Sequence, residues 1–156
     1  MKNGTLTPRL DYTATAPGVY KAMDALDGYV AACGLESSLV LLVQLYVSQI
    51  NGCAYCVDMH WKQLKAAGES DVRLYSLSVW RESPYYSDRE RAALMWAEGV
   101  TLVTRNHVPD ALHREVSRHF SERSLADLTL AIVAINGWNR LSIAARLLPG
   151  SFSVTT

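Results

Sequence analysis

The 156-residue sequence has no long hydrophobic run and no excess of charge of either sign. Its longest uninterrupted apolar stretch covers residues 130–135, whereas a membrane-spanning helix needs about 20 such residues. Lys and Arg together number 15, as do Asp and Glu, so no long-range field attracts nucleic acid or an anionic surface. We therefore expect neither a nucleic-acid partner nor a membrane partner.

The N-terminal residues lack the apolar segment of about 7 to 15 residues that marks a secretory signal, which predicts a cytoplasmic protein. Cysteine is also scarce, with only Cys33, Cys53 and Cys56. An odd number of cysteines without an export signal argues against a structural disulfide framework and favours catalytic, redox or metal chemistry.

What the sequence has in abundance is apolar side chains. Hydrophobic residues make up 49% of the chain and charged residues only 19%. A chain of this length buries roughly two-thirds of its unfolded surface in one core, so we expect a single domain over residues 1–156. The remaining apolar surface predicts contact with further copies of the chain in a homo-oligomer.

Proline is absent between Pro17 and Pro84, so helices can run unbroken there. Ser87 and Glu90 have the spacing of a capping box, and Ser124 and Asp127 repeat the pattern. The seven helices expected from such signals cover residues 17–33, 38–50 behind Ser37 or Ser38, 53–67, 71–79 behind Ser70, 88–103, 109–120 and 124–148. No strand is required, and the fold class is all-α.

The dipeptide Asn51-Gly52 allows two interpretations. Asn-Gly between apolar segments is a strong signal for a β-hairpin. The alternative is a helix that ends at Gly52, because residues 39–50 are apolar on nearly all sides, as in a buried helix, and helix-forming residues follow.

The segment from Cys53 to His60, CAYCVDMH, carries the candidate chemistry. On a helix, positions i, i+3 and i+7 fall within an arc of roughly 60°, so Cys53, Cys56 and His60 share one face. Cα atoms three residues apart lie about 5 Å from each other, within the range of a disulfide. The spacing therefore permits cycling between dithiol and disulfide.

Each cysteine has a reason to ionise. Cys53 lies at the helix start, where free N–H groups favour a thiolate, and Cys56 lies one turn before His60, a base. A thiolate that attacks a peroxide becomes a sulfenic acid, which a neighbouring thiol converts to a disulfide. This chemistry needs no metal and no cofactor.

Two other interpretations of the segment remain open. Cys53, Cys56 and His60 can hold zinc with a fourth ligand from water or from His107, His113 or His119. The cysteines can also be a purely structural pair. Covalent haem is excluded, because that motif needs a histidine directly after the second cysteine, and Val57 stands there.

The segment that contains the motif and three further segments carry a resemblance. SQINGCAYCVDMHWKQLKAAGE, YSDRERAALMWAEGVTL, NHVPD and DLTLAIVAINGWNRL strongly resemble the alkylhydroperoxidase AhpD-like branch of the carboxymuconolactone decarboxylase family. The resemblance covers most of the chain. It implies a single-domain helical bundle with the Cys-x-x-Cys at the start of a central helix, and homo-oligomers built from dimers, such as a hexamer. It also implies an antioxidant peroxidase that reduces alkyl or hydrogen peroxides and is recharged by a dithiol or disulfide-exchange protein.

By the same resemblance, Cys56 is the thiol that attacks peroxide, Cys53 resolves the sulfenic acid, and His60 is the base. The family pattern has a glutamate twelve positions before the first cysteine, and here that position is Leu41. Leucine cannot relay a proton, and an amide such as Gln44 can orient water without acting as a base. The departure leaves an alternative function, thiol-disulfide exchange or redox sensing with little peroxidase activity.

Overall fold

The computed structural model describes residues 6–154, and within them the chain is helical with no strand. The helices are α1 (Tyr12–Thr15), α2 (Pro17–Ala32), α3 (Ser37–Asn51), α4 (Ala54–Ala66), α5 (Asp71–Ser76), α6 (Asp88–Thr101), α7 (Val103–Asn106), α8 (Asp110–Val116) and α9 (Glu122–Ala145). A 3₁₀ turn, Leu77–Val79, follows α5. The all-α prediction is confirmed.

Most of the helix boundaries agree with the expectation from sequence. Pro17 begins α2, and Ser87 and Glu90 form the capping box of α6. Two short helices, α1 and α7, were not expected. The expected helix over 71–79 is split into α5 and the 3₁₀ turn, and the one over 109–120 is shortened to α8.

The start of the last helix corrects the prediction made from Ser124 and Asp127. Ser121 is the N-cap of α9, and its side chain accepts from the backbone N–H of Ser124. Asp127 is buried and accepts a hydrogen bond from Tyr29 at 2.8 Å. Its carboxylate therefore joins α9 to α2 and does not cap the helix.

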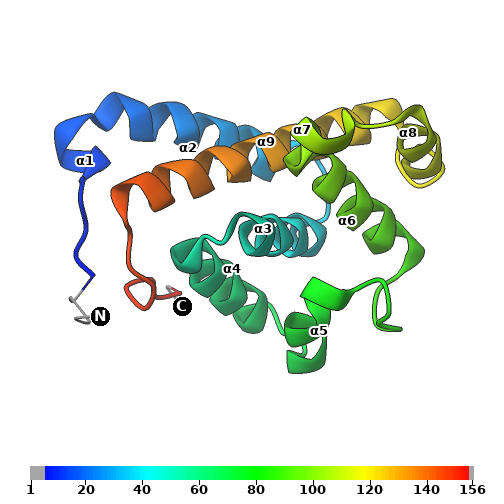
Figure 1. Ribbon diagram of the computed structural model, residues 1–156, viewed down its shortest axis with the longest axis horizontal. Coiled ribbons are helices and arrows are strands. Elements are labelled where there is room, and N and C mark those ends of the chain that lie inside the picture. Colours follow the sequence, from blue (N-terminus) through cyan, green and yellow to red (C-terminus); the bar gives the residue numbers. More distant parts are fainter. Residues whose placement is uncertain (1–5, 155–156) are drawn as a thin grey trace.

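Helix α3 lies at the centre of the bundle, with α9 on one side and α4 on the other (Figure 1). Its apolar side chains are almost completely buried on several faces, as residues 39–50 predicted; they are Leu39, Val40, Leu42, Val43, Leu45 and Val47. Burial of each such side chain contributes about 1.5–3 kcal/mol. This burial holds α3 in place, and α4 with it.

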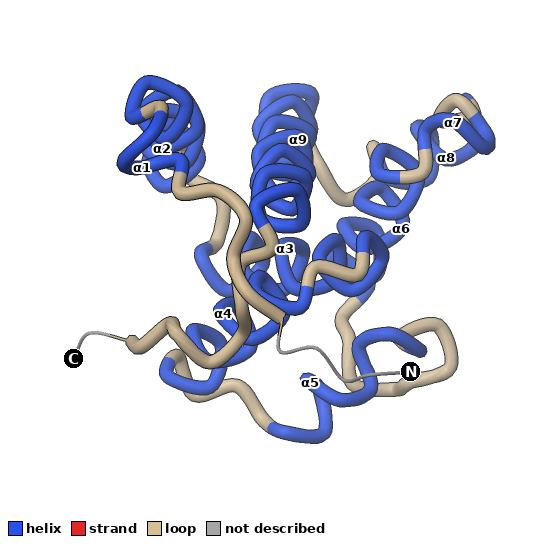
Figure 2. Tube along the Cα trace, turned by 60° about the vertical axis from the view of Figure 1, so that its left-hand side comes forward, coloured by secondary structure: helices blue, strands red, loops and turns tan. Residues whose placement is uncertain are grey.

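Helix α9, seen nearly end-on in Figure 2, is the longest of the described helices and packs against several others. By length and composition alone it is apolar enough to cross a membrane. In this fold it contacts α2, α3, α4 and α6, and it carries the buried polar side chains of Asp127, Asn139 and Ser142. These features are those of the core helix of a bundle.

The turn between α3 and α4 decides the question left open by Asn51-Gly52. Helices flank it on both sides, so the hairpin interpretation is wrong. Gly52 adopts φ 69° in the left-handed region, which favours glycine. The N–H of Cys53 donates to the carbonyl of Ser48 at 3.0 Å, which completes a Schellman-type helix end.

A buried polar cluster fastens this turn to α9. Asn139, which is fully buried, donates from Nδ2 to Ser48 Oγ at 3.0 Å and accepts from Asn51 Nδ2 at 2.8 Å. Asn51 also donates to Asn136, and Arg140 donates to the Asn136 amide oxygen at 2.8 Å. The hydrogen-bond cluster lies directly behind the first cysteine of the motif.

We predict that Asn139→Ala lowers the free energy of unfolding by about 2–3 kcal/mol, because Ser48 and Asn51 each lose a buried hydrogen bond. The matched control is Asn106→Ala, the same change at an exposed position, which should cost under about 0.5 kcal/mol. Urea denaturation of the three proteins checks this. Equal midpoints would show that the cluster does not stabilise the fold.

Candidate functional site

The site begins at the N-terminus of α4. Cys53 is the N-cap residue, and its sulfur accepts a hydrogen bond from the backbone N–H of Cys56. The two cysteines are joined as a disulfide, with Cα atoms 5.4 Å apart. Both residues are only 1% exposed. The close approach that the spacing predicted is therefore present, with the pair shielded from bulk solvent.

His60 lies two turns into α4 and is 4% exposed. Its Nδ1 is 2.9 Å from Oε1 of Gln63, and its Nε2 is buried without a hydrogen-bond partner among the described residues. A neutral ring that donates from Nδ1 to Gln63 leaves Nε2 free to accept a proton. Gln63, a residue that the sequence analysis did not single out, thus sets the orientation of the imidazole.

Burial lowers the pKa of His60 to about 4, and the hydrogen bond to Gln63 opposes the shift only in part. The physical cause is the loss of hydration, which penalises the charged imidazolium. At neutral pH the ring is therefore uncharged and able to act as a base, provided that a nearby negative charge stabilises the protonated form.

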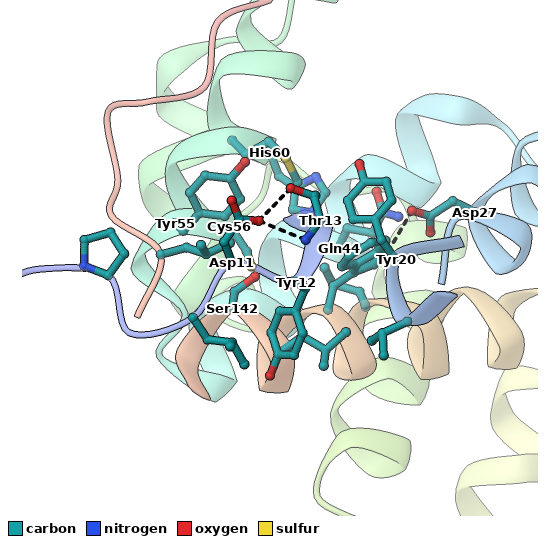
Figure 3. Close-up of a pocket in the computed structure, with 18 residues that line it drawn as sticks. Asp11, Tyr12, Thr13, Tyr20, Asp27, Gln44, Tyr55, Cys56, His60 and Ser142 are labelled. Carbon is teal, nitrogen blue, oxygen red and sulfur yellow. Dashed lines mark hydrogen bonds between the residues drawn. The ribbon is translucent and has the colours of Figure 1, made fainter. Parts of the chain in front are cut away.

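A cavity of about 470 Å³ opens against Cys56 and His60 (Figure 3). Four parts of the chain line it. They are the N-terminal segment with α1 (Pro8, Leu10, Asp11, Tyr12, Thr13), α2 (Val19, Tyr20, Asp27), α3 and α4 (Gln44, Tyr55, Cys56, Met59, His60), and α9 with the chain after it (Ile135, Trp138, Leu141, Ser142, Leu147). Cys56 lines the cavity, whereas Cys53 lies behind it.

The N-terminal segment covers one side of the cavity. Arg9 N–H donates to the carbonyl of Ala145 at 2.8 Å, which ties the segment to the end of α9. Asp11 then caps α1 by accepting from the backbone and side chain of Thr13. Sequence patterns gave no sign of this cover, since its position depends on contacts with α9.

Leu41 is half-buried on α3, one turn before Gln44, and packs against the main core. It is not among the lining residues, whereas Gln44 is. In Figure 3, Gln44 lies between His60 and Asp27. No carboxylate in the described part of the chain is hydrogen-bonded to His60; Gln63 fills that place on one side of the ring.

The other candidates from the sequence lie as follows. Tyr55 lines the cavity, while Trp61 is exposed. His107 follows α7, and His113 lies on α8, which packs against α6; His119 follows α8. Among residues 6–154, no group of three His, Cys, Asp or Glu side chains is placed to hold a metal ion.

The profile of the Carboxymuconolactone decarboxylase family matches residues 17–99. YdfG of Bacillus subtilis, an uncharacterised protein, is 39% identical over 139 residues, which is 89% of this chain and 95% of YdfG. The family match includes the Cys-x-x-Cys segment and the central helix α3.

Solved structures show the same fold. ATU0492 from Agrobacterium tumefaciens, a protein of unknown function designated as an AhpD antioxidant defence protein, is 40% identical with a TM-score of 0.90, over 94% of this chain and 100% of its own. A peroxidase-related protein with an AhpD core from Ralstonia eutropha is 20% identical, with a TM-score of 0.78 over 88% of this chain and 74% of its own. The debrominase Bmp8 is 16% identical with a TM-score of 0.75, over 96% of this chain and 94% of its own. The last two show likeness of fold alone.

The lowered pKa of His60 predicts that acid destabilises the fold. Between pH 6.5 and about 4 the unfolded chain binds a proton at His60 that the folded chain does not, so stability falls as pH falls. From pH 7 to pH 5 we expect a loss of about 2 kcal/mol from this residue.

Urea denaturation at pH 7 and pH 5 checks the prediction, with His60→Gln as the comparison protein. The variant should lose about 2 kcal/mol less than the wild type over this interval. The same loss in both proteins would show that His60 is not responsible.

Proposed function

Since the chain belongs to the carboxymuconolactone decarboxylase family, in its AhpD-like branch, we propose that it is a thiol-dependent peroxidase that reduces organic or hydrogen peroxides. The observation that carries the proposal is the position of Cys56. Its sulfur belongs to a pair able to form a disulfide, faces a cavity large enough for an organic substrate, and lies one helical turn before an uncharged histidine. Cys56, Cys53 and His60 are the proposed catalytic residues.

The reaction starts from the dithiol form. The Cys56 thiolate attacks one oxygen of the peroxide, so that an S–O bond forms, the O–O bond breaks and an alkoxide leaves as the alcohol after taking a proton. Cys53 then attacks the sulfenic sulfur, an S–S bond forms and water leaves. In total, one peroxide and two thiols give one alcohol, one water and one disulfide.

His60 serves as the proton carrier in this scheme. Its Nε2 accepts the Cys56 proton while Nδ1 stays bonded to Gln63, and the same proton goes to the leaving alkoxide. A buried imidazolium alone is unfavourable, as its lowered pKa indicates. The adjacent thiolate supplies the compensating charge. Proton transfer from Cys56 to His60 therefore creates an ion pair, which is lost when the proton passes to the leaving alkoxide.

The scheme requires two kinds of partner. A dithiol or disulfide-exchange protein must reduce the Cys53–Cys56 disulfide after each turnover. We also propose homo-oligomers, because large apolar side chains remain exposed on α2 and α9; they include Tyr29, Val133 and Ile143. Further copies of the chain are the partner expected to cover them.

A second function, thiol-disulfide exchange without an efficient peroxidase step, is favoured by one observation. The residue at the position of the family glutamate is Leu41, and it points into the core rather than the cavity. In this alternative the dithiol still cycles to the disulfide and back, but Cys56 reacts with peroxide only as fast as an ordinary thiol does. Rates of the reduced protein with peroxide separate the two functions.

Cysteine variants test which sulfur attacks. We predict that Cys53→Ser reacts with one equivalent of cumene hydroperoxide and leaves a sulfenic acid on Cys56, because the neighbouring thiol that resolves it has been removed. Cys56→Ser should consume peroxide at least 100-fold more slowly. Cys33→Ala, the matched control at the free cysteine, should react within about twofold of the wild type. Dimedone labelling with mass spectrometry that finds the sulfenic acid on Cys53 would reverse the assignment.

Gln63 variants test the role of His60. Gln63→Glu places a carboxylate at Nδ1, which stabilises the imidazolium and raises the pKa of His60. We expect a roughly tenfold faster single-turnover reaction with cumene hydroperoxide at pH 7 and a lower apparent pKa for the thiol. Gln63→Leu removes the bond and should slow the reaction by about tenfold. Identical pH-rate profiles in wild type and Gln63→Glu would rule out His60 as the proton carrier.

A further inference from the structure

The cavity beside Cys56 is much larger than hydrogen peroxide requires. Its 470 Å³ falls within the range of sites that hold organic ligands of drug size. The walls are aromatic and aliphatic side chains from three helices, with Tyr20 and Trp138 packed edge to face at 5.3 Å; the others include Tyr55, Met59, Ile135 and Leu141. Such walls fit a flat or compact apolar molecule.

Asp27 supplies a polar anchor in this wall. Its Oδ2 accepts a hydrogen bond from Nε1 of Trp138 at 2.7 Å, whereas its Oδ1 is buried with no hydrogen-bond partner in the described part of the chain. A buried oxygen that accepts no hydrogen bond raises the free energy of the folded protein. A ligand N–H or O–H that donates to this oxygen recovers that free energy on binding. Burial, the largest cause, raises the pKa of Asp27, and Asp24 on the same helix adds to the increase.

The charged side chains that line the cavity further restrict which ligands can bind. None of the described residues that line the cavity is Lys or Arg, and its two carboxylates are those of Asp11 and Asp27. Asp11 is occupied in capping α1. The carboxylates would therefore repel an anionic ligand, and no Lys or Arg is present to hold it. A ligand that donates a hydrogen bond or carries a positive charge can instead bind to Asp27.

We propose that the cavity binds an apolar, aromatic-sized organic molecule that carries an amine or hydroxyl group, which donates a hydrogen bond to Oδ1 of Asp27. Figure 3 shows Asp27 on the opposite side of Gln44 from His60, so such a molecule lies with its other end at Cys56. This inference deepens the proposed function, on which it rests: the substrate is a hydroperoxide of this class, and carboxylate-bearing hydroperoxides are poor substrates.

Binding to the oxidised protein tests the inference without any peroxide chemistry. Four probes share one scaffold and differ in one group: 4-isopropylbenzylamine, 4-isopropylbenzyl alcohol, p-cymene and 4-isopropylbenzoate. Titration is followed by the fluorescence of the tryptophans, of which Trp138 lines the cavity, and by calorimetry. We expect the amine and the alcohol to bind at least tenfold more tightly than p-cymene, and the benzoate to bind most weakly.

Two variants locate the effect. In Asp27→Asn the amide oxygen is retained by Trp138, so the NH₂ group faces the cavity and the amine should lose at least tenfold in affinity, while p-cymene changes less than twofold. Asp110→Asn is the matched control, the same change at an exposed position on α8 outside the cavity, and it should alter no affinity by more than twofold. Circular dichroism confirms that each variant is folded.

Several results would overturn the inference: equal affinities of the four probes for the wild type, tightest binding of the benzoate, no measurable binding of any probe, or an unchanged amine affinity in folded Asp27→Asn. The wild-type series decides the matter even if Asp27→Asn does not fold. Because the disulfide form is used, the expected order of affinities supports the inference about the ligand even if the cysteine variants disprove the peroxidase step.

Discussion

The burial of α3 on nearly every side is the constraint on which the site depends. A helix enclosed by α4, α6 and α9 has little freedom to rotate or slide, because each movement exposes apolar surface or opens a void. Its C-terminal turn is held by Gly52 in the left-handed region and by Asn139 beneath Ser48 and Asn51. Cys53 follows that turn directly. The cysteine pair is thus attached to a tightly packed part of the molecule.

The same burial determines the electrostatics of the site. Burial of His60 removes its hydration and penalises the charged ring, so in the proposed scheme its proton affinity depends on the charge of the Cys56 sulfur. A thiolate at Cys56 favours the imidazolium, whereas a disulfide removes that charge. In the proposed scheme the proton is therefore held at His60 only during the step that uses it.

Sequence reasoning was most successful where the signal is local. The capping box of Ser87 and Glu90, the start of α2 at Pro17 and the helix end at Gly52 each depend on a few adjacent residues. The close approach of Cys53 and Cys56 at the start of α4 was predicted by their spacing in the same way, whereas their burial depends on packing that the spacing does not specify.

The remaining features depend on contacts between distant segments. Asp127 was expected to cap a helix, but it bonds to Tyr29, which lies 98 residues earlier in the chain. Asp27 lines the cavity with one of its oxygens bonded to Trp138 of α9, 111 residues later in the chain. No spacing rule connects such pairs. The position of Asp27 in the cavity and the N-terminal segment that covers the cavity are therefore evident only from the three-dimensional structure.

The most direct test of the account is a thiol count on the reduced wild-type protein before and after one equivalent of cumene hydroperoxide, with the alcohol product measured in parallel. The account predicts that three thiols per chain fall to one, that Cys33 is the thiol that remains, and that one equivalent of alcohol forms within seconds. Three thiols remaining after minutes, with the hydroperoxide intact, would contradict it.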